Sequence, residues 1–247
     1  MRAYLSVLLL LLCVTLCASS QTADELVSKN IQARGGMEKI KAVQTYRATG
    51  KFSTTGGFAV TAAASLDRMR PNLMRQSFTL ESMTQVLAYD GSTGWQIQPF
   101  QGRRDPELMG EDDLRDLTID ADIDGPLVDY KEKGNRVEYL GHDIVDGDDA
   151  LRLKVTLKDG DIIYYYLDPD TYLEIRKETQ EFIRGSVKEN VTDLGSYKPV
   201  AGVMYPFSMS FGPKNDPSAW ATVTVDKIEI NSGVERSEFA VPAALKK

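Results

Sequence analysis

Most of the chain alternates between apolar and polar residues with a period of two. Leu151 and Leu153, for example, fall on one side of an extended chain, and Arg152 and Lys154 fall on the other. The alternation begins at Gln44 and recurs in about ten segments. This pattern predicts strands that each have one buried face.

Short turn motifs separate these segments and predict antiparallel hairpins. Asp90-Gly91 and Asp168-Pro169-Asp170 are two of them. In the last segment the apolar phase shifts between Val225 and Ile228, which predicts a β-bulge. A sheet with one apolar face either closes into a barrel or is an open half-barrel covered by helices.

Two segments break the alternation and are predicted to provide such a cover. Residues 24–42 have apolar residues at helical spacing up to Gly35-Gly36, followed by a short second helical segment. Residues 105–132 contain eleven Asp or Glu residues with apolar residues between them. We predict one or two short amphipathic helices there, joined by a loop.

The first 20 residues have the features of a secretory signal peptide. Arg2 precedes an apolar run, and Ala18-Ser19-Ser20 provides small residues for cleavage, which we place after Ser20. Cleavage would remove Cys13 and Cys17 and leave a mature chain without disulfides or thiol chemistry. Export without disulfides predicts a periplasmic location, with an uncleaved anchor as the alternative.

Charge and motif content argue against several classes of function. The net charge of −7 argues against nucleic acid as a partner. His142 is the only histidine and lies in a turn-like segment without a nucleophile motif. We therefore predict no catalytic residue and no cofactor, although a pair of acidic residues acting on lipid or glycan stays an alternative.

One acidic motif resembles half of a calcium-binding loop. Asp120 to Gly125, "DADIDG", has acids at positions 1, 3 and 5 and glycine at position 6 of an EF-hand loop. Position 12, where the loop requires glutamate, is Lys131. We predict an acidic turn and no metal site, while calcium binding stays open.

The apolar strand faces are rich in methionine and phenylalanine. Methionine side chains repack easily, which suits a surface that adapts to a flexible ligand. The small residues Ala62, Ala63 and Ala64 leave room beside this surface. We predict a lipid-sized cavity, with an ordinary hydrophobic core as the alternative.

Two stretches resemble the LolA/LolB-like superfamily of periplasmic proteins that sort outer-membrane lipoproteins. They are "RPNLMR" at residues 70–75 and "YDGSTGWQIQPF" at residues 89–100. The resemblance implies an eleven-strand half-open barrel with lid helices and a cavity that receives acyl chains. It also implies that Arg70 holds the lid by hydrogen bonds to lid-helix carbonyl groups. We expect the acidic insertion to add salt bridges to the same arginine.

We therefore predict an α+β fold in which a strongly curved antiparallel sheet of about 10–11 strands forms a half-open β-barrel covered by short lid helices. Residues 21–247 would form a single domain with an acidic helical lid insertion near 105–132. The predicted ligand-binding residues are Arg70, Phe58, Met74, Phe78, Trp95 and Phe207.

The predicted function is that of a non-enzymatic periplasmic carrier of the acyl chains of lipoproteins or lipids. Met74 and Gln76 stand where the superfamily motif has aromatic residues. The resemblance therefore predicts the fold of this chain better than it predicts the cargo. Handover from an inner-membrane donor to an outer-membrane acceptor protein and binding of free lipid both stay open. The alternative is an envelope sensor or scaffold that binds a partner protein with the same fold.

Overall fold

The computed structural model describes residues 21–54, 59–183 and 185–245. The predicted signal peptide, residues 1–20, lies outside these described residues, and so does Phe58. Within these ranges, no helix combines the length and the apolar character that crossing a membrane requires.

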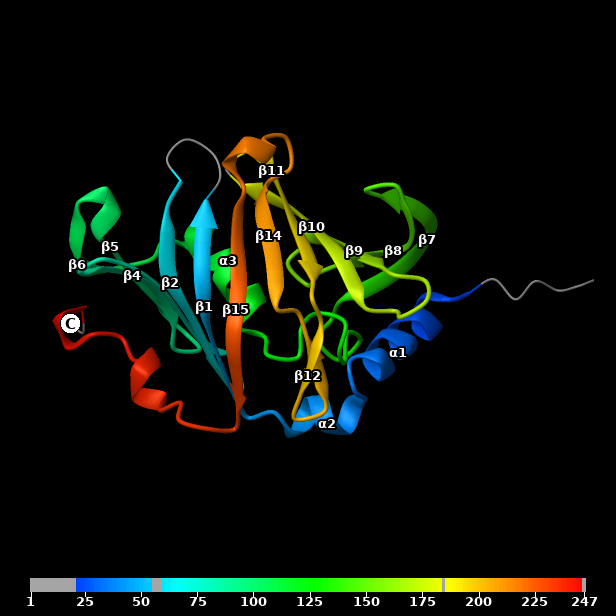
Figure 1. Cartoon of the computed structure of the whole chain (residues 1–247), viewed down its shortest axis with the longest axis horizontal. Coiled ribbons are helices and arrows are strands. Elements are labelled where there is room, and N and C mark those ends of the chain that lie inside the picture. Colours follow the sequence, from blue (N-terminus) through cyan, green and yellow to red (C-terminus); the bar gives the residue numbers. More distant parts are fainter. Residues whose placement is uncertain (1–20, 55–58, 184, 246–247) are drawn as a thin grey trace, which may run out of the picture.

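Thirteen strands form one continuous antiparallel sheet, shown in Figure 1. Their order across the sheet is β6-β5-β4-β3-β2-β1-β15-β14-β11-β10-β9-β8-β7. The first six strands in the sequence are β1 (Thr45–Thr54), β2 (Thr61–Met69), β3 (Leu73–Leu80), β4 (Met83–Tyr89), β5 (Gly94–Gln98) and β6 (Arg103–Leu108). The others are β7 (Arg136–Val145), β8 (Asp148–Thr156), β9 (Ile162–Leu167), β10 (Glu174–Ile183), β11 (Ser186–Gly195), β14 (Ser208–Pro213) and β15 (Ala221–Ile230).

The chain enters this sheet at its centre. Strands β1 to β6 step outward to one edge, and the chain then crosses through helix α3 (Glu111–Ala121) to β7 at the opposite edge. It steps back inward until β15 pairs with β1, where Tyr46 lies opposite Ile230. The edge strands β6 and β7 are not paired with each other, so the curved sheet stays open.

The predicted fold class is confirmed, but the sheet has more strands than the predicted 10–11. Strand β6 lies partly inside the segment predicted as helical, and it pairs only with β5. It contains Pro106, which an edge strand tolerates because one side of its backbone has no strand to bond. A separate two-stranded hairpin, β12 (Lys198–Val200) with β13 (Val203–Tyr205), adds a further pair.

Two helices precede the sheet and cover part of one face, called here the inner face. Helix α1 (Ala23–Ala33) begins with a capping box between Thr22 and Glu25. Its buried residues Leu26 and Ile31 pack with the inner residues of β8 and β9. Helix α2 (Met37–Ala42) follows after Gly35, where a Cβ atom would come within 2.2 Å of the Gly202 carbonyl oxygen.

The predicted turns and bulge are present. Strands β4 and β5 pair around residues 90–93, and β9 and β10 pair around residues 168–173. In the pairing of β1 with β15, Thr49 lies opposite Lys227 and Gly50 lies opposite Val225. Asp226 is therefore the extra residue of the β-bulge, as the phase shift in the sequence predicted.

The C-terminal segment covers the opposite, outer face of the sheet. Phe239, in a 3-10 helix (η3, Arg236–Phe239), is fully buried against Leu73 and Val234. Arg47 on β1 bonds both Asp67 and Glu238, at 2.6 and 2.7 Å. The segment is red in Figure 1 and runs toward the β6 edge.

Candidate ligand-binding cavity and its lid

The inner face of the central strands encloses an apolar cavity of about 280 Å³. Its walls come from β1, β2, β3, β10, β11, β14 and β15, and Asp120 at the end of α3 also lines it. The lining side chains that are apolar are Tyr46, Ala48, Ala64, Leu66, Met74, Phe78, Leu194, Met209, Phe211, Val223 and Val225. This composition suits a hydrocarbon ligand.

A second cavity of about 180 Å³ continues from the first. It lies beneath the segment that follows α3, because Ile123 and Leu127 are among its lining residues. The two cavities share several walls, including Leu66, Arg68 and Met209. The two cavities therefore adjoin beneath the lid.

Aromatic rings gather on the inner face near the ends of three strands. The ring of Phe52 lies 4.7 Å from that of Phe78 and 6.4 Å from that of Phe211, measured between centroids. Phe78 and Phe211 line the cavity. Tilted aromatic pairs at these separations interact more favourably than their buried apolar area alone would predict. The three rings therefore stabilise one another in this wall of the cavity.

Helix α3 and the segment that follows it, residues 122–135, form the lid over this space. Leu117 and Ala121 of the helix are buried against Met74 and Tyr89 of the sheet. Gly94 of β5 allows this approach, because a Cβ atom there would lie 2.5 Å from the Leu114 side chain. Figure 1 shows α3 behind the central strands.

Arg70, in the turn between β2 and β3, ties the lid to helix α2. Its guanidinium donates to the carbonyl oxygens of Val43, at 2.6 Å, and Ile40, at 3.1 Å. It also donates to both carboxylate oxygens of Asp124, at 2.9 and 2.5 Å. The planar guanidinium thus satisfies two helix C-terminal carbonyl groups and a lid carboxylate at once.

Asp124 is the centre of this network, and its side chain is only 4% exposed. Lys41 pairs with it at 2.7 Å, and Arg34 donates to its backbone carbonyl oxygen at 3.1 Å. Burial acts to raise the pKa of the Asp124 carboxyl, but the hydrogen bonds from Arg70 and Lys41 outweigh burial and lower the pKa below its ordinary value. The carboxylate is therefore charged wherever the protein is near neutral pH.

A second ion pair holds the lid helix itself. Arg115 on α3 donates to Asp161, in the turn between β8 and β9, at 2.6 and 3.1 Å. It also donates to the Phe182 carbonyl oxygen at the tip of β10. The lid is thus attached to the sheet from the helix as well as from the following segment.

The residues predicted to bind the ligand do not all meet in one place. Met74 and Phe78 line the cavity, while Arg70 lies beside it in the lid network. Phe207 is buried in a cluster with Tyr46 and Ala48, which line the cavity, but it is not itself one of the lining residues.

Trp95 lies on the outer face and not at the cavity. It packs with Val86 and Ala88, and its indole N–H donates to the Phe239 carbonyl oxygen at 3.1 Å. The neighbouring Gln96 faces inward, and successive strand residues face opposite sides. Trp95 therefore faces away from the cavity, and the expectation that it contacts the ligand is wrong.

Three charged residues at the cavity were not among the predicted ones. Arg68, Asp120 and Lys177 line both parts of the space. Arg68 continues the inward series of Ala62, Ala64 and Leu66 on β2. A cation at an inward position was therefore a readable signal in the sequence.

The acids of the "DADIDG" motif face cations. Asp122 pairs with Lys133 at 2.5 Å, Asp124 with Arg70 and Lys41, and the nearest oxygen of Asp120 lies 3.9 Å from Lys177. Among the described residues no group of three or more His, Cys, Asp or Glu residues is arranged to hold a metal ion. His142 is 61% exposed and contacts Asp149.

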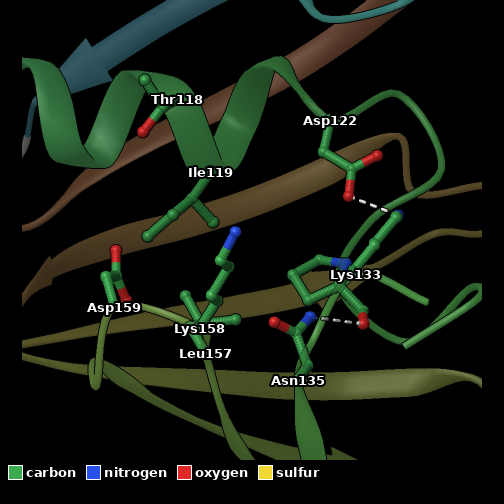
Figure 2. A pocket seen from close by; sticks show the side chains of 9 residues that line it. Thr118, Ile119, Asp122, Lys133, Asn135, Leu157, Lys158 and Asp159 are labelled. Atoms are coloured by element: carbon green, nitrogen blue, oxygen red, sulfur yellow. Dashed lines mark hydrogen bonds and ion pairs between the residues drawn. The ribbon is translucent and has the colours of Figure 1, made fainter. Parts of the chain in front are cut away.

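A further hollow of about 450 Å³ lies outside the lid, between α3 and the turn after β8 (Figure 2). Lys133 spans its rim to Asp122, and Asn135 donates to the Pro126 carbonyl oxygen. Lys158 and Asp159 at its rim are exposed, Lys133 and Asp122 are half-buried and paired with each other, and the hollow is more open to solvent than the space beneath the lid. The space beneath the lid is the better candidate for an apolar ligand.

Comparison with solved structures shows the same fold in several bacterial proteins. No family model and no curated protein matches the sequence. A LolA superfamily protein from Nitrosomonas europaea matches with a TM-score of 0.62 at 11% identity, covering 90% of this chain and 99% of that one. A protein of the DUF1329 family from Desulfovibrio piger matches with a TM-score of 0.62 at 12% identity, covering 92% and 100%.

An outer-membrane lipoprotein-sorting protein domain from Vibrio parahaemolyticus matches with a TM-score of 0.59 at 11% identity, covering 88% of this chain and 97% of that one. The chain therefore has a LolA-like fold. At these identities the comparison establishes the fold alone.

Proposed function

We propose that this chain is a non-enzymatic periplasmic carrier that binds an acyl chain of a lipoprotein or lipid beneath its lid. The observation that carries the proposal is an apolar cavity closed by a lid whose attachments are polar. Apolar walls hold a hydrocarbon chain, and a lid held by ion pairs can exchange its bonds for water when it opens.

Loading would begin with separation of the lid from the sheet. The contacts of Asp124 with Arg70 and Lys41 would open at one end, and the contacts of Arg115 would open along the helix. The ligand would then enter the cavity between α3 and the sheet, and the lid would close over it. Transfer to an acceptor would reverse these steps.

The test is native mass spectrometry of residues 21–247 purified from a periplasmic fraction without detergent. We expect adducts of lipid or acylated-peptide mass that disappear on organic extraction. The Ala64→Phe variant, which fills the cavity from β2, should lose these adducts. The matched control is Ala63→Phe, because Ala63 is the exposed neighbour on the same strand.

A wild-type protein that stays free of lipid after incubation with lipids would contradict the carrier function. It would favour the alternative, a scaffold that binds a partner protein. Equal occupancy in both alanine variants would show that lipid binds elsewhere on the molecule.

A further inference from the structure

Arg68 is a partly buried cation in the largely apolar cavity beneath the lid. It projects from the inner face of β2 and lines both parts of the space beneath the lid. Its Nε atom is buried and has no hydrogen-bond acceptor in the described part of the chain. Its guanidinium carbon lies 5.7 Å from the centroid of the Tyr46 ring.

The other arginines near the lid have a different role. Arg70 and Arg115 use their donors on carboxylates and carbonyl oxygens, at distances of 2.5 to 3.1 Å. Arg34 donates to a carbonyl oxygen of the lid. Within the described ranges Arg68 makes no such contact, so the lid attachment does not explain its position.

The charges around the larger cavity do not cancel. Its lining includes Arg68 and Lys177 as cations and Asp120 as the only carboxylate among them. Asp120 lies 3.9 Å from Lys177. The adjoining cavity is balanced, since it has three cations and three carboxylates, and one of these, Asp122, is paired with Lys133.

We infer that the ligand is an anionic amphiphile whose carboxylate or phosphate head pairs with Arg68 while its acyl chain lies against Phe78 and Phe211. This inference rests on the proposed carrier function and specifies the chemical class of its ligand. Guanidinium offers a planar set of donors that fits a carboxylate or phosphate. A bound anion would provide the acceptor that the buried Nε atom lacks.

The geometry also orients the ligand. Arg68 is near the end of β2 next to the Arg70 turn, and Phe78 is near the opposite end of the neighbouring strand β3. Met74 lies opposite Arg68 and Ala64 lies opposite Phe78, and between these two pairs the inner face presents Leu66 and Gln76. The head would thus lie beside the lid network and the chain would run toward the aromatic wall.

The test compares three ligands of equal chain length, palmitate, hexadecyl phosphate and hexadecanol, by native mass spectrometry and by competition with a fluorescent fatty acid. We expect the wild-type protein to bind both anions about tenfold or more tightly than the alcohol, as expected for a charged hydrogen bond. Arg68→Gln should remove this preference and leave hexadecanol binding unchanged. Arg68→Lys should retain part of the preference.

Lys51→Gln is the control, because it makes the same change in net charge at an exposed position of β1. It should leave all three affinities as in the wild type. Equal binding of anions and alcohol by the wild-type protein would overturn the role of Arg68 and leave the carrier function standing. Binding of none of the three would count against both, and a preference for one anion would identify the head group as carboxylate or phosphate.

Discussion

Arg70 joins the lid, helix α2 and the β2–β3 turn through a single guanidinium. Replacing it with leucine removes its four hydrogen bonds, while Lys41 still partners Asp124. We expect bound fatty acid to be released to phosphatidylcholine vesicles roughly tenfold faster, which corresponds to about 1.4 kcal/mol of lid attachment. The change in release should exceed the change in stability.

Arg103→Leu is the control for this measurement. Arg103 pairs with Glu107 in the exposed edge strand β6, away from the lid network. It should leave the release rate unchanged. Equal release rates for Arg70→Leu and the wild type would exclude the lid attachment as a determinant of release.

The Asp124 carboxyl makes the lid attachment dependent on pH. Its pKa in the folded protein lies below the ordinary value of 3.8. A lowered pKa contributes stability that is complete above the unfolded-state value and is lost as pH falls through the folded-state value. We expect hydrogen exchange in residues 111–135, measured relative to the intrinsic rate at the same pH, to become faster only below about pH 4. This is the region where an unperturbed carboxyl titrates.

Asp124→Asn should make this exchange fast already at neutral pH and remove its dependence on acid. Hydrogen exchange followed by mass spectrometry measures both effects. An acid dependence that persists unchanged in Asp124→Asn would assign it to a different carboxyl group.

The C-terminal segment on the outer face stabilises the sheet without contacting the cavity. Phe239→Ala leaves a space beside Leu73 and should lower the free energy of unfolding by about 3–5 kcal/mol. Trp95→Phe removes the bond to the Phe239 carbonyl oxygen and part of a buried ring, and should lower it by about 1–3 kcal/mol. Denaturant unfolding measures both changes.

Trp95→Phe should also leave lipid occupancy as in the wild type, because Trp95 faces away from the cavity. Phe78→Ala, which removes part of the aromatic wall, should reduce it. Loss of lipid in Trp95→Phe and not in Phe78→Ala would reverse the assignment of the two faces.

The element predictions succeeded where the local pattern is strong. Alternation located most strands, and the phase shift after Val225 located the bulge. Strand β6 was missed because its only strand partner is β5 and its residues do not alternate cleanly. Trp95 was placed on the wrong face because the four-residue connection between β4 and β5 sets the phase of the next strand, and a change of one residue reverses it.

The site was less predictable because its contacts are distant in the sequence. Arg70 meets Asp124 only because the chain crosses from one edge of the sheet to the other through α3. The resemblance to a known superfamily singled out Arg70, but local pattern alone did not select Asp124 from eleven acids in its segment. The inward position of Arg68 follows from the series Ala62, Ala64 and Leu66, but only the structure shows that its Nε atom lacks an acceptor among the described residues.

At the scale of the whole molecule, cavity volume limits the cargo. The larger cavity of about 280 Å³ lies just below the usual range of about 300–1,000 Å³ for small-molecule sites. With the lid in place we expect one acyl chain per molecule at saturation, measured by native mass spectrometry. Two or more bound chains would show that the lid moves away from the sheet in the loaded state.

The pairing of β1 with β15 has a consequence for how the molecule is made. These strands come from opposite ends of the chain, and both contribute walls to the cavity. Contacts so distant in sequence form late and slow folding. If the chain crosses a membrane starting from its N-terminus, the apolar cavity lacks one wall until β15 has emerged. Cargo can therefore bind only after the whole chain has been exported and folded.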